Sequence, residues 1–337
     1  MKDLIVAVGC MDSGLTPPMP FVGRRYDGGE CAGQARLLLE SALLRCGFDI
    51  SDRPLPVTES QEIIMQANRS GADCIVVLSC GAFGSRKSFN DVKGGAVKYS
   101  IGRHASKSRE LAEDVCAKLA GVKPCATGMC GHEWNGSFCP VIVVEMGYLT
   151  NFDEAKLLFD PDYIRNVAEY ATMGICEYFG MPYIPHSPAA YKQFHARIGM
   201  RGKSIKLLQA ALCFNGYKIN IDGVYDKNTD VAVKEFSINN GVRPDDTCED
   251  ILNNIFSVAP TELSAGAKHK NVLYLQRKLN AKLYTSPSSG ELDGDTIAAL
   301  NEYLTETENS HLIAADGVTK QALQLLSEIG GGRPRLF

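Results

Sequence analysis

Hydrophobic and polar positions in residues 1–180 follow two different periods. Short apolar runs rich in β-branched residues predict buried strands, and longer stretches with apolar residues three and four positions apart predict amphipathic helices. The predicted strands are 4–9, 74–79, 95–100 and 141–145, and the predicted helices are 30–46, 59–70, 105–120 and 160–179. Strands that alternate with helices predict an α/β fold with helices on both faces of the sheet. The fold class expected for this domain, together with the family resemblance given below, is a twisted mixed sheet flanked by helices.

Residues 181–200 break this alternation. Three prolines, Pro182, Pro185 and Pro188, fall in this segment. Proline removes a backbone donor and disfavours helix, so the segment predicts an extended linker. The linker would separate an α/β domain at 1–180 from the rest of the chain.

The C-terminal part contains an internal repeat with an offset of 67 residues. Five pairs share this offset: Gln209 and Gln276, Leu212 and Leu279, Thr229 and Thr296, Val233 and Leu300, Phe236 and Tyr303. One offset common to five pairs predicts two copies of one helical unit. We expect two small all-α domains, at 201–257 and 266–330, each of three helices as the family resemblance given below implies.

Each copy is expected to carry an Asp-Gly turn between two helices, followed by a threonine at the N-cap of the second helix. The residues are Asp222, Gly223 and Thr229 in the first copy and Asp293, Gly294 and Thr296 in the second.

Composition places the chain among ordinary globular proteins. Of its 337 residues, 45% are hydrophobic and 22% are charged. The net charge of −4 argues against a nucleic-acid-binding surface. The sequence has no stretch apolar enough to span a membrane, and its N-terminus does not read as a signal peptide. Twelve cysteines without the close spacing of a disulfide scaffold predict reduced thiols in a cytoplasm.

Glu145 is the strongest candidate for chemistry. It ends the β-branched run at 141–144 and is followed by Met146-Gly147. A carboxylate at the tip of a buried strand is costly to desolvate unless a metal, a reacting group or an ion pair uses it. A structural salt bridge and a catalytic role both fit this position.

The repeat resembles the small three-helix peptidoglycan-binding domain. The resemblance rests on the Leu-Gln helix at Gln209, on the turn from Asp222 to Thr229, and on Ala232-Val233-Lys234-Glu235-Phe236. Asp226 stands where the family has a second glycine. The second copy is more degenerate, although 314–319 is similar to the closing turn of the family. This resemblance implies that the C-terminal part binds the cell wall, the alternative being a generic helical bundle.

Residues 1–180 resemble the zinc-dependent N-acetylmuramoyl-L-alanine amidases of type 3. The matching motifs are Val8-Gly9-Cys10, Glu30, Ala67-Asn68, Ala72-Asp73, Leu78-Ser79-Cys80, Gly94 to Tyr99, Ser106 to Ala112, and Pro140 to Asn151. The resemblance implies a peptidoglycan hydrolase that cleaves the amide between N-acetylmuramic acid and L-alanine. It also implies a zinc-activated water and Glu145 as the general base.

The expected metal ligands depart from the family, because Cys10 and Cys80 replace two histidines. With Glu30 they would give zinc a more negative site and a less acidic water. Three interpretations follow: an active amidase with a Cys-Glu-Cys zinc site, a catalytically inactive amidase-like wall-binding protein, or a redox-switched Cys10–Cys80 pair. An active enzyme is the leading prediction.

Other residues near these motifs are candidates for auxiliary roles. His132 and Trp134 lie in the loop before the Glu145 strand, where the histidine could add a ligand and the indole could stack on substrate. Arg86 and the Arg24-Arg25 pair could hold an acidic stem peptide, or be solvated surface charges. Without an export signal, we expect a chain that starts in the cytoplasm and reaches the wall as an endolysin or autolysin, after release or by non-classical export.

Overall fold

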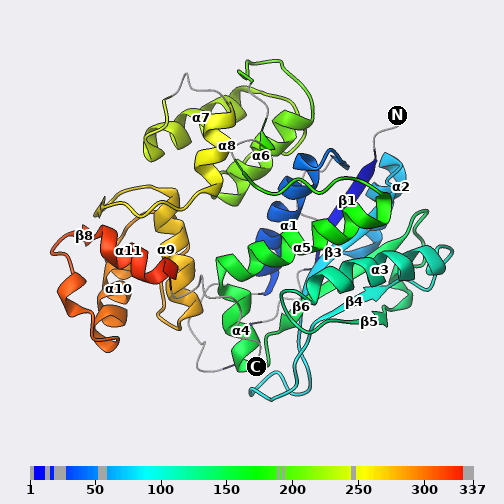
Figure 1. The fold of residues 1–337 in the computed structure, drawn as a ribbon, viewed down its shortest axis with the longest axis horizontal. Helices are drawn as coiled ribbons and strands as arrows, with labels where there is room; N and C mark the ends of the chain where they lie inside the picture. The colour runs from blue at the N-terminus through cyan, green and yellow to red at the C-terminus, as the bar shows by residue number, and fades with distance from the viewer. Residues whose placement is uncertain are drawn as a thin grey trace.

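The structure is a computed structural model in which a sheet domain is followed by two helical units (Figure 1). It describes residues 4–11, 16–18, 28–51, 59–187, 190–191, 194–243 and 248–328. No helix within these ranges combines the length and the apolar character that crossing a membrane requires.

The first domain is built on a six-stranded mixed sheet of order β2-β1-β3-β6-β4-β5. Its strands are β1 (Ile5–Cys10), β2 (Asp49–Ile50), β3 (Cys74–Gly81), β4 (Ala96–Tyr99), β5 (Ala126–Met129) and β6 (Val141–Tyr148). Neighbouring strands are parallel except β4 and β6, which are antiparallel. The predicted mixed sheet is therefore confirmed. β2 and β5 escape the sequence pattern because β2 has only two residues and β5 is largely exposed without an apolar run.

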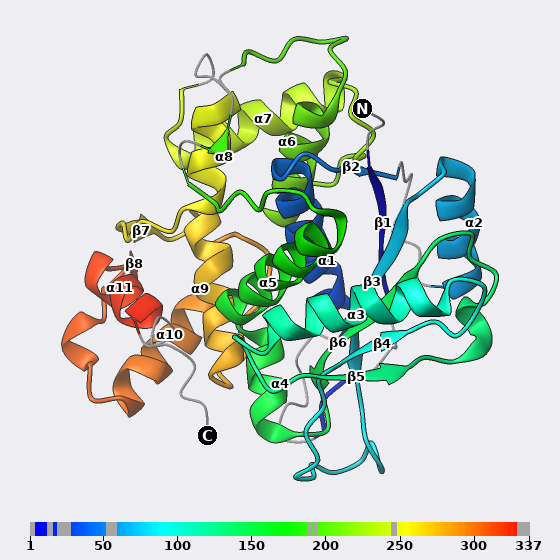
Figure 2. The ribbon, with the colours of Figure 1, turned by 45° about the vertical axis from the view of Figure 1, so that its right-hand side comes forward.

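Helices cover both faces of this sheet (Figure 2). They are α1 (Gly28–Arg45), α2 (Ser60–Ser70), α3 (Ala105–Leu119), α4 (Phe152–Phe159) and α5 (Pro161–Phe179). Residues of α1, α3 and α5 share one apolar cluster with alternate positions of β1, β3 and β6. α2 packs with the other alternate positions. Successive strand residues point to opposite faces, so each strand divides its side chains between the two clusters.

The first residues of the predicted linker at 181–200 contact the sheet domain instead of forming a free spacer. The guanidinium of Arg45 donates to the carbonyl oxygen of Ile184 at 2.8 Å. The hydroxyl of Tyr183 donates to the Glu169 carboxylate at 2.6 Å. These contacts hold the first residues of the linker against α1 and α5.

Two units of three helices each follow the linker segment. They comprise α6 (Lys203–Phe214), α7 (Lys227–Asn240) and α8 (Cys248–Phe256), then α9 (Lys270–Ala281), α10 (Gly294–Glu306) and α11 (Lys320–Glu328). A two-stranded sheet, β7 (Leu263–Ser264) with β8 (Gly317–Val318), closes the second unit. The first unit packs α6 on α1 and shares the apolar cluster of the sheet domain, whereas the second has a cluster of its own.

The two copies keep one buried hydrogen-bond network. The amide nitrogen of Gln209 donates to Asp222, Val224 and Thr229, and its oxygen accepts from the Gly223 N–H. Gln276 makes the same set of bonds at positions 67 residues later: Ser289, Glu291, Thr296 and the Gly290 N–H. A buried amide must satisfy its donors and acceptor, so this network fixes the same turn in both units.

The network corrects two expectations. Asp226 and Asp293 are the N-caps of α7 and α10, and Thr229 and Thr296 lie three residues inside, each donating its N–H to the aspartate. The Asp293–Gly294 pair is therefore not the second Asp-Gly turn, because Gly294 begins a helix.

The true equivalent of Asp222–Gly223 is Ser289–Gly290. Gly223 and Gly290 have φ values of 73° and 75°, a conformation that glycine adopts without strain. The sequence comparison missed this pair because Asp222 aligns with a serine, whereas a second Asp-Gly dipeptide occurs four residues later.

Both helical units dock on the sheet domain through a buried lysine. The Lys206 ammonium on α6 lies 2.9 Å from the Asp49 carboxylate and 2.8 Å from the Ile50 carbonyl oxygen. The Lys278 ammonium on α9 lies 3.0 Å from Asp160 and 2.6 Å from Asp162 at the start of α5. The side chain of Lys278 is only 1% exposed, and the two carboxylates are its ion-pair partners across the interface.

Candidate active site

Glu145 is the fifth of the eight residues of β6, a central strand of the sheet, and the strand continues past the predicted end at Glu145 to Tyr148. Glu145 stands opposite Ser79 of β3 and Ala96 of β4, and its side chain is 9% exposed. The Lys98 ammonium on β4 lies 2.8 Å from Oε2 of Glu145. Lys98 and Glu145 occupy diagonal positions of the antiparallel pair, and the pleat places both on the same face.

Gly81 and Gly94 have no side chains, and this leaves room for the Glu145 carboxylate and the neighbouring Tyr148 ring. A Cβ on Gly81 would lie 2.8 Å from Oε2 of Glu145 and 2.8 Å from the Tyr148 ring. A Cβ on Gly94 would lie 2.5 Å from the same ring. Burial, and next the negative charge of Glu145, raise the pKa of the Tyr148 phenol. The carboxylate is thus bordered by a glycine backbone, a neutral phenol and an ammonium.

Glu154 on α4 is a buried carboxylate that the sequence reasoning missed. It accepts hydrogen bonds from the N–H groups of Gly94 and Tyr148 at 2.7 and 2.8 Å. Its second oxygen accepts from the Lys123 ammonium at 3.1 Å. Glu154 therefore ties the loop before β4 to the end of β6, the two segments that border Glu145. The signal was present as Asn151-x-x-Glu154, an N-cap pattern in which Asn151 accepts from the Glu154 N–H.

The expected metal ligands lie in different surroundings. Cys10 and Cys80 belong to the apolar cluster on the α1 face of the sheet and are 4% and 3% exposed. Alternation along β6 places Glu145 on the opposite face from Val144 and Met146, which belong to that cluster. Glu30 begins α1 and lines a cavity together with residues of the second helical unit.

These side chains do not fit a metal ion as they stand. Among the residues described, no three His, Cys, Asp or Glu side chains form a group that could hold one. Cys10, Glu30 and Cys80 are all described, so they do not make such a group. All twelve cysteines are free thiols, and Cys46, Cys74, Cys116 and Cys176 are buried. A disulfide between Cys10 and Cys80 remains a prediction for oxidising conditions.

Of the residues proposed for auxiliary roles, Trp134 is buried, whereas His132 and Arg86 are exposed. Trp134 is 2% exposed and packs with α2 and β6, so the expectation that its indole stacks on substrate is wrong. His132 is exposed, with a ring nitrogen 3.1 Å from the Asn135 amide. Arg86 is exposed in the loop between β3 and β4. Arg24-Arg25 lie outside the described residues.

Two segments of the chain match known protein families. Residues 38–177 match the family model of N-acetylmuramoyl-L-alanine amidases, and residues 201–245 match that of a peptidoglycan binding domain. The first match includes Cys80 and Glu145, and begins after Cys10 and Glu30. Among curated proteins, none matches the chain.

Several solved structures are similar over about half of the chain. The N-acetylmuramoyl-L-alanine amidase from Clostridium difficile 630 has 20% identity and a TM-score of 0.46, over 53% of this chain and 98% of that one. The catalytic domain of CwlV, the amidase from Bacillus (Paenibacillus) polymyxa var. colistinus, has 21% identity and a TM-score of 0.45, over 54% and 100%. AmiC2 of Nostoc punctiforme has 22% identity and a TM-score of 0.44, over 52% and 97%. Residues 38–177 are thus similar to the N-acetylmuramoyl-L-alanine amidases, and residues 201–245 are similar to a peptidoglycan binding domain.

Proposed function

We propose that this chain is a peptidoglycan hydrolase that cleaves the amide between N-acetylmuramic acid and L-alanine of the stem peptide. The observation that carries the proposal is the placement of Glu145, within the amidase family match, in the carboxyl-terminal half of a central strand and beside Lys98. Ligands of α/β sheets commonly bind at the carboxyl ends of strands. The peptidoglycan binding domain match supports the same polymer as the substrate.

The proposed chemistry gives Glu145 the role of general base. Its carboxylate takes a proton from the water that attacks the amide carbon, and returns a proton to the leaving nitrogen as the C–N bond breaks. The products are a free carboxyl group on the lactyl side and a free amino group on L-alanine. The ammonium of Lys98 holds the carboxylate in place and adds positive charge beside the carbonyl oxygen, where negative charge develops.

Zinc at Cys10, Glu30 and Cys80 remains part of this proposal only as a prediction. When bound, zinc would polarise the scissile carbonyl. Because the described side chains form no group of three that fits a metal ion, no step of the reaction is assigned to it.

The test is release of N-terminal alanine from purified peptidoglycan by the reduced full-length protein. We expect release by the native protein and none by Glu145→Gln, which keeps the side-chain shape but cannot take up the proton. Glu262→Gln, at an exposed position away from Glu145, is the matched control and should retain activity. A chelator-treated sample and a zinc-restored sample test the metal separately.

The alternative function, a catalytically inactive amidase-like wall-binding protein, is separated by the same assay. No alanine release under any metal condition, with sedimentation on insoluble peptidoglycan retained, would establish that alternative. Release that persists in Glu145→Gln would show that the assignment of the base is wrong.

A further inference from the structure

The two helical units each present one equivalent surface to a cavity. In the first unit this surface comprises Gly216, Lys218 and Glu235, and in the second the positions 67 residues later are Leu283, Thr285 and Glu302. Gly216 and Leu283 share a left-handed backbone, with φ values of 93° and 74°. Leucine rarely adopts this conformation, so the second unit keeps the turn at some cost in strain.

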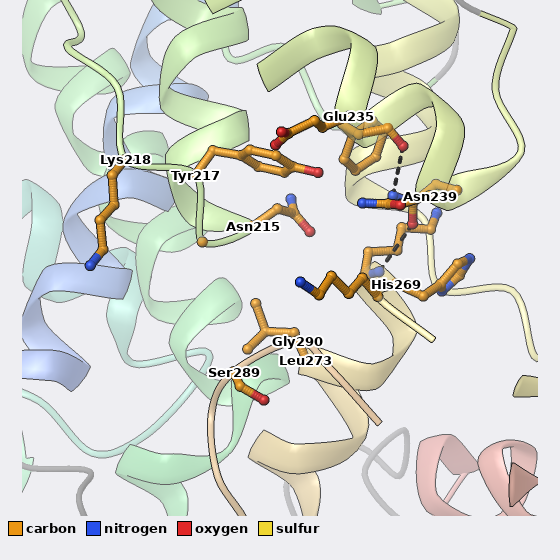
Figure 3. A pocket seen from close by; sticks show the side chains of 14 residues that line it. Asn215, Tyr217, Lys218, Glu235, Asn239, His269, Leu273, Ser289 and Gly290 are labelled. Atoms are coloured by element: carbon orange, nitrogen blue, oxygen red, sulfur yellow. Dashed lines mark hydrogen bonds between the residues drawn. The ribbon is translucent and has the colours of Figure 1, made fainter. Parts of the chain in front are cut away.

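The first cavity, which we name the inter-repeat pocket, has a volume of about 330 Å³. Tyr217 and Glu235 of the first unit form one wall, and Leu273 and Ser289 of the second unit form the other (Figure 3). In Figure 3 the Tyr217 hydroxyl points toward the Asn239 amide, while the Lys218 ammonium lies at the rim. Neither unit could form this pocket alone.

The second cavity, which we name the Glu30 pocket, has a volume of about 790 Å³. Its walls are Thr285, Ser289 and Glu302 of the second unit and Glu30 at the start of α1. The equivalent surfaces of the two units therefore each line a pocket. The surface of the first unit faces the second unit, and the surface of the second unit faces Glu30 of the sheet domain.

Ser289 lines both pockets, so the loop that carries it borders each of them. From Tyr217 to Glu30 the walls pass from the first unit, through the second, to the sheet domain. A ligand long enough to occupy both pockets would therefore cross from the binding units to the domain that carries Glu145.

The lining groups suit a polymer with amide, hydroxyl and charged groups. The inter-repeat pocket presents the amides of Asn215 and Asn239, the ring of Tyr217 and the ammonium groups of Lys218 and Lys268. The Glu30 pocket presents hydroxyls and carboxylates, from Thr285, Ser288, Glu30, Asp295 and Glu302. An N-acetylated glycan offers hydroxyls and amides, and its stem peptide offers carboxylates and an amine. The lysines of the inter-repeat pocket suit the carboxylates of the stem peptide, and the carboxylates of the Glu30 pocket suit its amine.

We propose that the inter-repeat pocket and the Glu30 pocket are successive subsites for one peptidoglycan strand. The identity of the polymer rests on the proposed function, whereas the pairing of the pockets rests on the repeat and on Ser289. Two linked subsites bind one long ligand more tightly than two separate short ones, because the second contact is intramolecular.

The test compares short and long ligands in the full-length protein carrying Glu145→Gln, which prevents cleavage. The short ligand is the disaccharide–peptide monomer, and the long ligand is an uncrosslinked glycan strand of several such repeats. We expect the long strand to bind at least about tenfold more tightly than the monomer.

Blocking variants at equivalent positions then test each pocket. Glu235→Trp and Glu302→Trp place a bulky side chain at exposed helix positions that line the two pockets. Each should reduce the affinity for the long strand to near that for the monomer. Lys234→Trp, on the same helix but lining neither pocket, should bind the strand as the parent does.

The outcomes separate this proposal from the proposed function. Equal strand binding by the blocked and parent proteins would overturn the subsites, whether or not alanine release is found. Absence of alanine release, with selective strand binding that both blocking variants abolish, would overturn the amidase function and support the subsites.

Discussion

Nζ of Lys98 lies 2.8 Å from Oε2 of Glu145, across the antiparallel pair of β4 and β6. Val97 and Val144 point into the apolar cluster on one face of the sheet, so Lys98 and Glu145 meet on the other. The ion pair therefore follows from strand register. It is consistent both with a structural role for Glu145 and with a base held ready for reaction.

A first prediction concerns this pair. Lys98→Met should lower the free energy of unfolding by about 1–3 kcal/mol, because it leaves a carboxylate that is 9% exposed without its ammonium. Adding Glu145→Gln should recover much of this loss, since the neutral amide needs no counter-charge. Urea unfolding of the two single variants and the double variant measures the coupling. Additive losses would mean that the two side chains do not stabilise each other.

A second prediction concerns the space beside Glu145. Gly81→Ala should lower the unfolding free energy by about 1–3 kcal/mol and abolish alanine release, because the new Cβ would displace Glu145 and Tyr148. Gly33→Ala on α1 is the matched control. Its Cβ would meet nothing within 4 Å, so we expect a gain of about 0.5–1 kcal/mol from helix propensity. Thermal unfolding and the alanine assay, run on both variants, check this; full activity in Gly81→Ala would contradict it.

A third prediction concerns pH. His269 is the N-cap of α9, with Nδ1 accepting from the Asn271 N–H at 3.0 Å. Burial, and next the charge of Lys270, lower its pKa from 6.5 to about 4. His269 therefore binds a proton below about pH 6.5 in the unfolded chain, but only below about pH 4 in the folded protein. Stability is lost as pH falls through this window.

The control for the pH prediction is His269→Asn, which keeps a capping oxygen but does not titrate. The difference in urea midpoint between pH 7 and pH 5 should be smaller in this variant than in the native protein. An identical difference in both would show that His269 is not the group responsible.

A fourth prediction concerns the docking of the second helical unit. Lys278→Met leaves Asp160 and Asp162 without the ammonium between them, and should weaken docking by about 2–4 kcal/mol. We expect faster proteolysis of the connection at 257–269. Lys234→Met removes an exposed i,i+4 pair with Asp230 and should change stability by less than about 0.5 kcal/mol. Unchanged proteolysis in Lys278→Met would mean that apolar contacts alone hold the unit.

The sequence by itself determined the repeat and most of the elements, although β2, β5 and α4 escaped its pattern. Buried strands and amphipathic helices impose periods of 2 and 3.6 on the apolar positions, so the alternation of strands with helices and the helical character of the C-terminal part follow from pattern alone. The offset of 67 residues was visible because Gln209 and Gln276 must satisfy the same buried hydrogen bonds. The β-branched run also placed Glu145 on a buried strand, although this strand continues to Tyr148 and does not end at Glu145 as predicted.

Only the tertiary structure decided what those residues meet. Strand register pairs Glu145 with Lys98, and the pleat places Cys10 and Cys80 on the other face from Glu145. Burial of Trp134 and the second turn at Ser289–Gly290 also depend on packing between segments distant in sequence. Local pattern fixes which face of its own element a side chain occupies, whereas the contacts of that face depend on the arrangement of all the elements.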